Sequence, residues 1–175
     1  GDTLLTLAFD ALAECGSLEM VRELARAAGP TGMAGGQVLD MEAEKSPPDL
    51  DGLVRLHRMK TGALIRASVR LGAMAARADD EMMRAFTCYG EAIGLAFQIM
   101  DDILDVTGDT EKMGKAAGRD AARQKTTYPT LVGLEQSQRL ADQAAQDAVN
   151  AISEMPGNAV KSLCSLAWYV VRREC

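Results

Sequence analysis

The segment from Glu81 to Asp105 reads EMMRAFTCYGEAIGLAFQIMDDILD, and it decides how the rest of the sequence is interpreted. Its apolar residues recur at spacings of three and four, which is the period of an α-helix. They fall on more than one side of that helix, and a helix that is apolar on several sides is usually buried. We therefore expect a long central helix that begins at Asp79 or Asp80 and ends in the acidic sequence DDILD at 101–105.

The same helical spacing continues on both sides of this segment, without the sustained alternation that is typical of β-strands. The polar, glycine-containing stretch 106–126 is expected to be an ordered loop with at most one helical turn. The fold class is therefore predicted to be all-α, a helical bundle, and 175 residues suffice for one domain. Further helices are expected from Asp2 as N-cap, from Ser17 to Gly29, and over 32–43, 50–78, 128–134, 135–155 and 158–173.

The composition argues against several classes of protein. A net charge of −6 does not suit a nucleic-acid-binding protein, which usually carries a basic face. No apolar run approaches the roughly 20 residues that cross a bilayer, so no stable membrane insertion is expected, and no secretory signal is recognisable. The cysteines at 15, 88, 164 and 175 have neither zinc-site spacing nor a readable disulfide framework. We expect reduced thiols in a cytoplasmic protein.

The acidic cluster at the end of the central helix is the first candidate site. Asp101 and Asp105 are four residues apart and share one helix face, with Gln98 on the same stripe. Before Gly108 the acids would lie near the negative end of the helix dipole, where carboxylates are disfavoured. A hard cation such as Mg²⁺, which takes oxygen ligands, would relieve this repulsion. The alternative is a solvated acidic face, but the apolar helix before the cluster and the lysines after it favour a metal site.

Lys60 is the second candidate, because it lies between apolar stretches and a buried lysine is rare unless it is paired. On these residues alone the favoured interpretation is a lysine whose stem is buried and whose ammonium reaches solvent. Gly35 and Gly36 cost about 1 kcal/mol each relative to alanine inside a helix, so close packing or a ligand is expected beside them. His57, the only histidine, is expected to be structural or superficial.

Four stretches follow one another along the chain: GMAGGQVLDMEAE (32–44), HRMKTGALIRASVRLGA (57–73), GLAFQIMDDILDVTGD (94–109) and GKAAGRDAARQKTTYPTLVGLE (114–135). Together, and in this order, they resemble the second half of members of the trans-isoprenyl diphosphate synthase (polyprenyl synthetase) family. Their motifs are most similar to those of the bacterial farnesyl diphosphate synthase type. The resemblance implies a helical bundle of the isoprenoid synthase type around a deep cavity, and a homodimer. Because the sequence opens at Gly1-Asp2 without methionine, 1–175 is expected to be the C-terminal half of one such domain.

The resemblance also implies an activity. The expected enzyme is a Mg²⁺-dependent prenyltransferase that condenses dimethylallyl or geranyl diphosphate with isopentenyl diphosphate to give farnesyl diphosphate, by ionisation, condensation and elimination. Three Mg²⁺ ions are expected in the complete site. A longer-chain polyprenyl product is one alternative, because the residues that set product length are expected upstream of this sequence. The other alternative is a non-catalytic helical protein derived from the family, which would bind a diphosphate or a partner protein.

The resemblance assigns roles to single residues. Asp101 would be the direct metal ligand, while Asp102 and Asp105 would act through bound waters or from outside the coordination shell of the metal. The allylic diphosphate would be held by three lysines: Lys60, Lys115 and Lys125. Groups near the developing carbocation would be Thr61, Gln98 and the backbone carbonyl of Lys60; Phe97 would lie near isopentenyl diphosphate, and Gln37 and Asp40 would line the cavity. The family's first aspartate-rich motif is absent, so residues 1–175 alone are expected to be inactive.

Overall fold

The computed structural model describes residues 1–113 and 126–173, with the side chains of 108–113 excepted. Every regular element in these ranges is helical, which confirms the all-α prediction. In chain order the elements are α1 (Asp2–Glu14), α2 (Leu18–Ala28), α3 (Met33–Ala43), α4 (Leu50–His57), the π-helical turn η1 (Arg58–Gly62), α5 (Ala63–Ala75), α6 (Asp80–Met113), α7 (Tyr128–Val132), α8 (Leu134–Ile152) and α9 (Asn158–Arg172).

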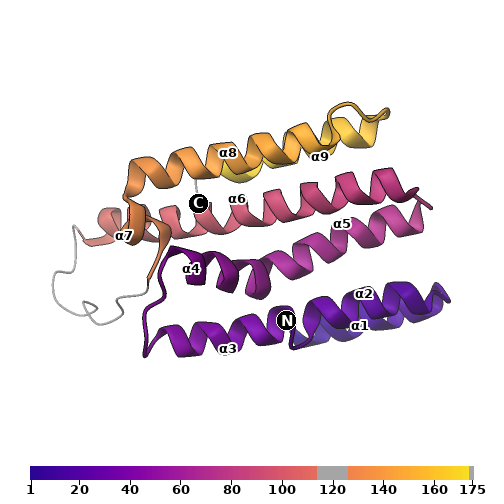
Figure 1. Cartoon of the computed structure of the whole chain (residues 1–175), viewed down its shortest axis with the longest axis horizontal. Helices are drawn as coiled ribbons and strands as arrows, with labels where there is room; N and C mark the ends of the chain where they lie inside the picture. The colour runs from indigo at the N-terminus through magenta and orange to yellow at the C-terminus, as the bar shows by residue number, and fades with distance from the viewer. Residues whose placement is uncertain (114–125, 174–175) are drawn as a thin grey trace.

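Helix α6 runs through the middle of the bundle, as its apolar pattern predicts. Figure 1 shows α8 and α9 along one side of it and α4 and α5 along the other, with α1, α2 and α3 beyond them. Tyr89, Ile93 and Ile99 of α6 are buried in the main core. Helix α8 presents alanines to this core at helical spacing, among them Ala141 and Ala145, which are fully buried. These small side chains allow close packing of α8 on α6.

Several helix starts follow from single side chains. Ser17 accepts a hydrogen bond from the backbone N–H of Met20 at 3.3 Å, and Asp79 accepts one from Met82 at 2.9 Å. Such N-caps satisfy backbone donors that the first turn leaves unpaired. They confirm the predicted starts of α2 and α6. Asp2 is not a cap, because α1 already includes it and Gly1 takes the N-cap position.

The predicted helix 50–78 differs from a single regular α-helix. It consists of α4, the π turn Arg58–Gly62 and α5, which ends at Ala75. π turns inside α-helices are rare and frequently lie at functional sites. Beside this turn the backbones of η1 and α6 approach closely, because a Cβ on Gly94 would lie only 3.1 Å from the Cα of Gly62.

The predicted loop 106–126 is partly wrong. Helix α6 continues to Met113, so the acidic cluster is followed by two further helical turns. The helix dipole acts only within the last turn, and its unfavourable end therefore lies well beyond Asp105. Residues 114–125 lie outside the described residues.

The outer helices leave apolar side chains exposed. No residue of α1 is buried, and Leu4 and Leu7 are 72% and 56% exposed. Val38 and Met41 of α3 are exposed as well. Within the described ranges, no helix combines the length and the apolar character that crossing a bilayer requires.

Candidate active site

Asp101 lies near the C-terminal part of α6, where α9 brings a cation to it. Arg173, directly after α9, donates to the Asp101 carboxylate through Nη2, and the two side chains form an ion pair. The guanidinium also lies over the Phe97 ring, 4.3 Å from its centroid, one helical turn before Asp101. Asp101, Arg173 and Phe97 therefore form one contact cluster between α6 and α9.

Burial raises the pKa of the Asp101 carboxyl above its ordinary value. The ion pair and hydrogen bond with Arg173 lower this pKa, whereas Asp105 and Asp102 raise it further through like-charge repulsion. Burial is the largest cause, so the single arginine does not fully offset it. Asp101 is thus a partly buried carboxylate for which additional positive charge would be favourable.

Asp102 has a different environment, although it is the next residue on the same helix. Successive residues on an α-helix are turned by about 100°, and this turn points Asp102 into the core, where it is 2% exposed. Its Oδ2 accepts a hydrogen bond from the backbone N–H of Tyr128 at 3.0 Å and lies 3.3 Å from Nε2 of His57. Asp102 therefore joins α6 to α4 and α7 and does not share the exposed side of Asp101.

His57 and Tyr128 complete this buried group. Their rings stack with centroids 5.8 Å apart, and both residues are buried. Burial, followed by the charge of Asp102, raises the pKa of Tyr128 to about 12. The structure places His57 in a structural contact, which is one of the two places expected from sequence.

Lys60 and Asp40, two candidates that lie 20 residues apart, form an ion pair. Lys60 belongs to the π turn and Asp40 to α3, and both side chains are partly buried. The two elements meet at Gly36, where a Cβ would lie 2.2 Å from the backbone nitrogen of Lys60. The predicted reason for the glycine pair, close packing, is therefore confirmed at Gly36.

The next two candidates lie around the contact of η1 with α6. Thr61 precedes Gly62 in the π turn, and Gln98 lies one helical turn after Gly94, the glycine that approaches Gly62. Both Thr61 and Gln98 are half-buried. The elements that carry these two side chains are therefore in direct contact.

Two further candidates lie at exposed positions. Gln37 is exposed on α3, and Asp105 is exposed on α6. Lys115 and Lys125 lie outside the described residues.

The donor set fits a Mg²⁺ ion that is shared with a substrate. Mg²⁺ is usually held by one or two carboxylates together with substrate phosphates and waters. Asp101 and Asp105 provide two carboxylates on one face of α6 that are not buried. Among the described residues, no three acidic, histidine or cysteine side chains gather closely enough to hold a metal on their own.

Sequence reasoning missed Arg173 and the pairing of His57 with Asp102. These contacts join residues 72 and 45 positions apart, so no local spacing could indicate them. The only available signal was the basic end of the amphipathic segment 158–173.

Comparison with known proteins gives a consistent result. The family described as Polyprenyl synthetase matches residues 1–164. Farnesyl diphosphate synthase of Escherichia coli (strain K12) is 46% identical over 186 residues, which cover 99% of this chain and 62% of that relative. This chain thus spans less than two thirds of the length of that relative.

Solved structures agree. An FPP/GFPP synthase from Zymomonas mobilis is 35% identical with a TM-score of 0.82, covering 97% of this chain and 58% of that one. A geranyltransferase from Helicobacter pylori, complexed with magnesium and isoprenyl diphosphate, is 31% identical with a TM-score of 0.73, covering 97% and 57%. From the match over residues 1–164 and these similarities, the chain belongs to the polyprenyl synthetase family.

Proposed function

We propose that the protein containing this chain is a trans-prenyltransferase that joins an allylic diphosphate to isopentenyl diphosphate, and that residues 1–175 form the C-terminal half of its single catalytic domain. One observation carries this proposal. The π turn bearing Lys60 and Thr61 packs against α6, which carries Gln98, Asp101 and Asp105. A cationic group and a carboxylate pair are thereby presented by two elements in contact, as a diphosphate with its metal ions requires.

Breaking the allylic C–O bond builds negative charge on the leaving diphosphate. Mg²⁺ bound directly by Asp101 would neutralise part of this charge and orient the leaving group. Asp105 would act through a bound water, and Asp102 from outside the coordination shell of the metal. Lys60 would donate to a diphosphate oxygen, and its ion pair with Asp40 holds the ammonium in place beforehand. Three Mg²⁺ ions in the complete site remain part of the proposal.

The carbon skeleton needs a different environment from the diphosphate. An allylic cation is stabilised by nearby dipoles but would be consumed by a good nucleophile. The hydroxyl of Thr61, the amide of Gln98 and the carbonyl of Lys60 supply such dipoles. Phe97 would contact the isopentenyl chain, and Gln37 would lie at the cavity wall. The diphosphate released by ionisation can accept the final proton, so no histidine base is needed.

Farnesyl diphosphate is the product that we propose. The E. coli relative is named for that product, and the Zymomonas structure is named as an FPP/GFPP synthase. These two relatives therefore support a short prenyl chain.

A homodimer is proposed as well. Leu4 and Leu7 on α1 and Val38 and Met41 on α3 are exposed apolar side chains that a second copy could cover. Sedimentation equilibrium of the protein with Leu7→Glu and Met41→Glu should show a weaker dimer; an unchanged association constant would argue against this surface.

The proposed activity is tested with radiolabelled isopentenyl diphosphate, geranyl diphosphate and Mg²⁺, with products separated by chain length. Asp101→Asn should lower turnover by at least about 10²-fold, the loss seen when one group that stabilises transition-state charge is removed. Asp80→Asn, a matched change at the opposite end of α6, should leave turnover unchanged. Absence of prenyl products from the wild type, or normal turnover of Asp101→Asn, would contradict the proposal.

A further inference from the structure

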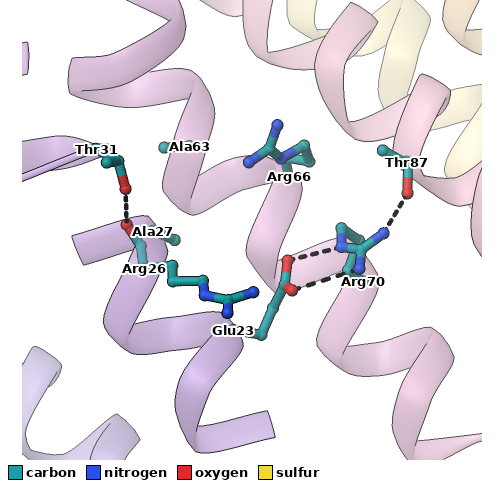
Figure 2. Close-up of a pocket in the computed structure, with 8 residues that line it drawn as sticks. All are labelled: Glu23, Arg26, Ala27, Thr31, Ala63, Arg66, Arg70 and Thr87. Atoms are coloured by element: carbon teal, nitrogen blue, oxygen red, sulfur yellow. Dashed lines mark hydrogen bonds and ion pairs between the residues drawn. The ribbon is translucent and has the colours of Figure 1, made fainter. Parts of the chain in front are cut away.

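A polar cavity lies apart from the candidate active site, between α2, α5 and α6. It is a cavity of about 410 Å³ that is open to solvent. Figure 2 shows the side chains that line it, among them those of Arg26, Arg66 and Arg70. None of the candidate active-site residues lines it. The lining residues are Glu23, Arg26, Ala27, Thr31, Ala63, Arg66, Arg70 and Thr87.

The charge of this cavity is opposite to that of the whole chain. Its lining holds three arginines and one carboxylate, that of Glu23, and a second carboxylate, that of Glu91, pairs with Arg66 from outside the lining. Positive charge is therefore in excess here, although the chain carries a net charge of −6. Such a local concentration of positive charge gives an acidic protein a place that attracts anions.

Arg70 forms the fixed wall of the cavity. Its Nε and Nη2 donate to the two carboxylate oxygens of Glu23 at 2.6 and 3.3 Å, and its Nη1 donates to Thr87 at 2.6 Å (Figure 2). All three guanidinium nitrogens are thus engaged. Arg70 and Glu23 largely neutralise one another and hold α2 against α5.

Arg26 and Arg66 keep donors available. Arg66 pairs with Glu91 through Nη1 at 3.1 Å, while its Nε is buried without a hydrogen-bond partner among the described residues. The Arg26 guanidinium forms no hydrogen bond or ion pair with any described residue. The buried Arg66 Nε is costly to leave without a partner, which usually signals a missing ligand or water. Arg26 is exposed, so its guanidinium donors are open to an incoming anion.

We propose that this cavity binds a small phosphoryl oxyanion, inorganic diphosphate or phosphate, at a site separate from the acidic cluster. Planar guanidinium groups donate to phosphate oxygens in matched pairs, and these charge-assisted hydrogen bonds are strong. The volume lies within the range of small-ligand sites. Only Ala27 and Ala63 among the lining residues are apolar, so the walls suit a free anion better than the tail of a prenyl diphosphate.

The test is isothermal titration of the protein with sodium diphosphate in excess EDTA. The chelator removes divalent ions, so the carboxylates of the candidate active site cannot recruit the anion through a metal. The wild type should bind about one diphosphate per chain. Arg26→Gln and Arg66→Gln should each weaken binding about tenfold, the loss expected for a charge-assisted hydrogen bond.

Two control variants distinguish binding in this cavity from binding elsewhere on the protein. Arg22→Gln removes the same charge from the same helix at a residue that does not line the cavity, and should change the affinity less than twofold. Asp101→Asn should leave the affinity unchanged. Geranyl diphosphate should bind no more tightly than inorganic diphosphate. The proposal is overturned by absence of binding in EDTA, by equal losses in Arg22→Gln and Arg26→Gln, or by tighter binding of geranyl diphosphate.

Discussion

Replacing Asp102 by alanine should lower the free energy of unfolding far more than the same replacement of its neighbour Asp101. The Asp102 carboxylate accepts from Tyr128 N–H at 3.0 Å and lies 3.3 Å from His57 Nε2, and the His57 and Asp102 side chains are each only 3% exposed. Alanine at 102 would leave both partners buried without an acceptor. Removing one partner of such a buried pair costs about 3–5 kcal/mol.

Asp101 should behave differently because its ion pair is more open to water. The Asp101 side chain is 37% exposed and its partner Arg173 is 21% exposed. Ion pairs in contact with solvent contribute about 0–1 kcal/mol. Asp101→Ala should therefore change the free energy of unfolding little, while removing a carboxylate from the proposed cation site.

The assay is thermal unfolding followed by far-UV circular dichroism, with Mn²⁺ binding measured on the same samples by electron paramagnetic resonance. In a domain of this size each kcal/mol corresponds to about 2–4 °C, so Asp102→Ala should lower Tm by about 6–20 °C. Asp102→Asn, which keeps an acceptor oxygen, should lose less. The reasoning is refuted if both alanine variants lose equal stability, or if Asp102→Ala loses Mn²⁺ binding while Tm is unchanged.

Four further outcomes are expected. Tyr89→Phe should lower the free energy of unfolding by about 1 kcal/mol, because the Tyr89 hydroxyl donates to a carbonyl of α9 at 2.8 Å. Tyr128→Phe should be neutral or stabilising, since that buried hydroxyl has no partner among the described residues. Urea unfolding that ranks the two variants in reverse would contradict this. Burial raises the pKa of both phenols to about 12, so the stability that their protons provide should be complete below pH 10 or so and be lost as the pH rises towards 12. An alkaline titration at 295 nm should show this late tyrosinate step diminished in each Phe variant. Gly36→Ala should destabilise the protein by about 1–3 kcal/mol, because its Cβ would overlap the η1 backbone. Gly72→Ala should stabilise it by about 0.5–1 kcal/mol, because its Cβ would contact nothing within 4 Å. Urea denaturation midpoints that move in the same direction for both variants would be inconsistent with this packing. Arg173→Gln should strengthen Mn²⁺ binding, because the competing cation on the acidic cluster is removed, and an unchanged dissociation constant would show that the arginine does not compete.

The order and type of the helices could be predicted from the sequence because both depend on local patterns. Apolar spacing located α6, and Ser17 and Asp79 marked helix starts through hydrogen bonds that span three residues. The end of α6 could not be predicted in this way. Gly108 costs a helix only about 1 kcal/mol, which is too little to stop α6 before Met113.

The sequence predicted which residues belong to the candidate site, but it did not predict how they contact one another. The spacing of Asp101 and Asp105 gives a shared face, but the turn of Asp102 into the core depends on His57 and Tyr128, which are 45 and 26 residues away. The ion pair between Lys60 and Asp40 likewise depends on how α3 packs against η1. Such contacts are set by tertiary packing, which no local pattern contains.

The π turn accommodates one extra residue within an otherwise continuous helical segment. A π turn holds one residue more than an α turn, so deleting one residue of Arg58–Gly62 would restore a regular helix between Leu50 and Ala75. Because the extra residue is taken up inside the turn, the faces of α4 and α5 would keep their relative orientation, and Leu53 and His57 would still be directed into the core. The deletion would act locally: it would redraw the turn that carries Lys60 and Thr61 and change the ion pair with Asp40, while the contact between His57 and Asp102 is kept.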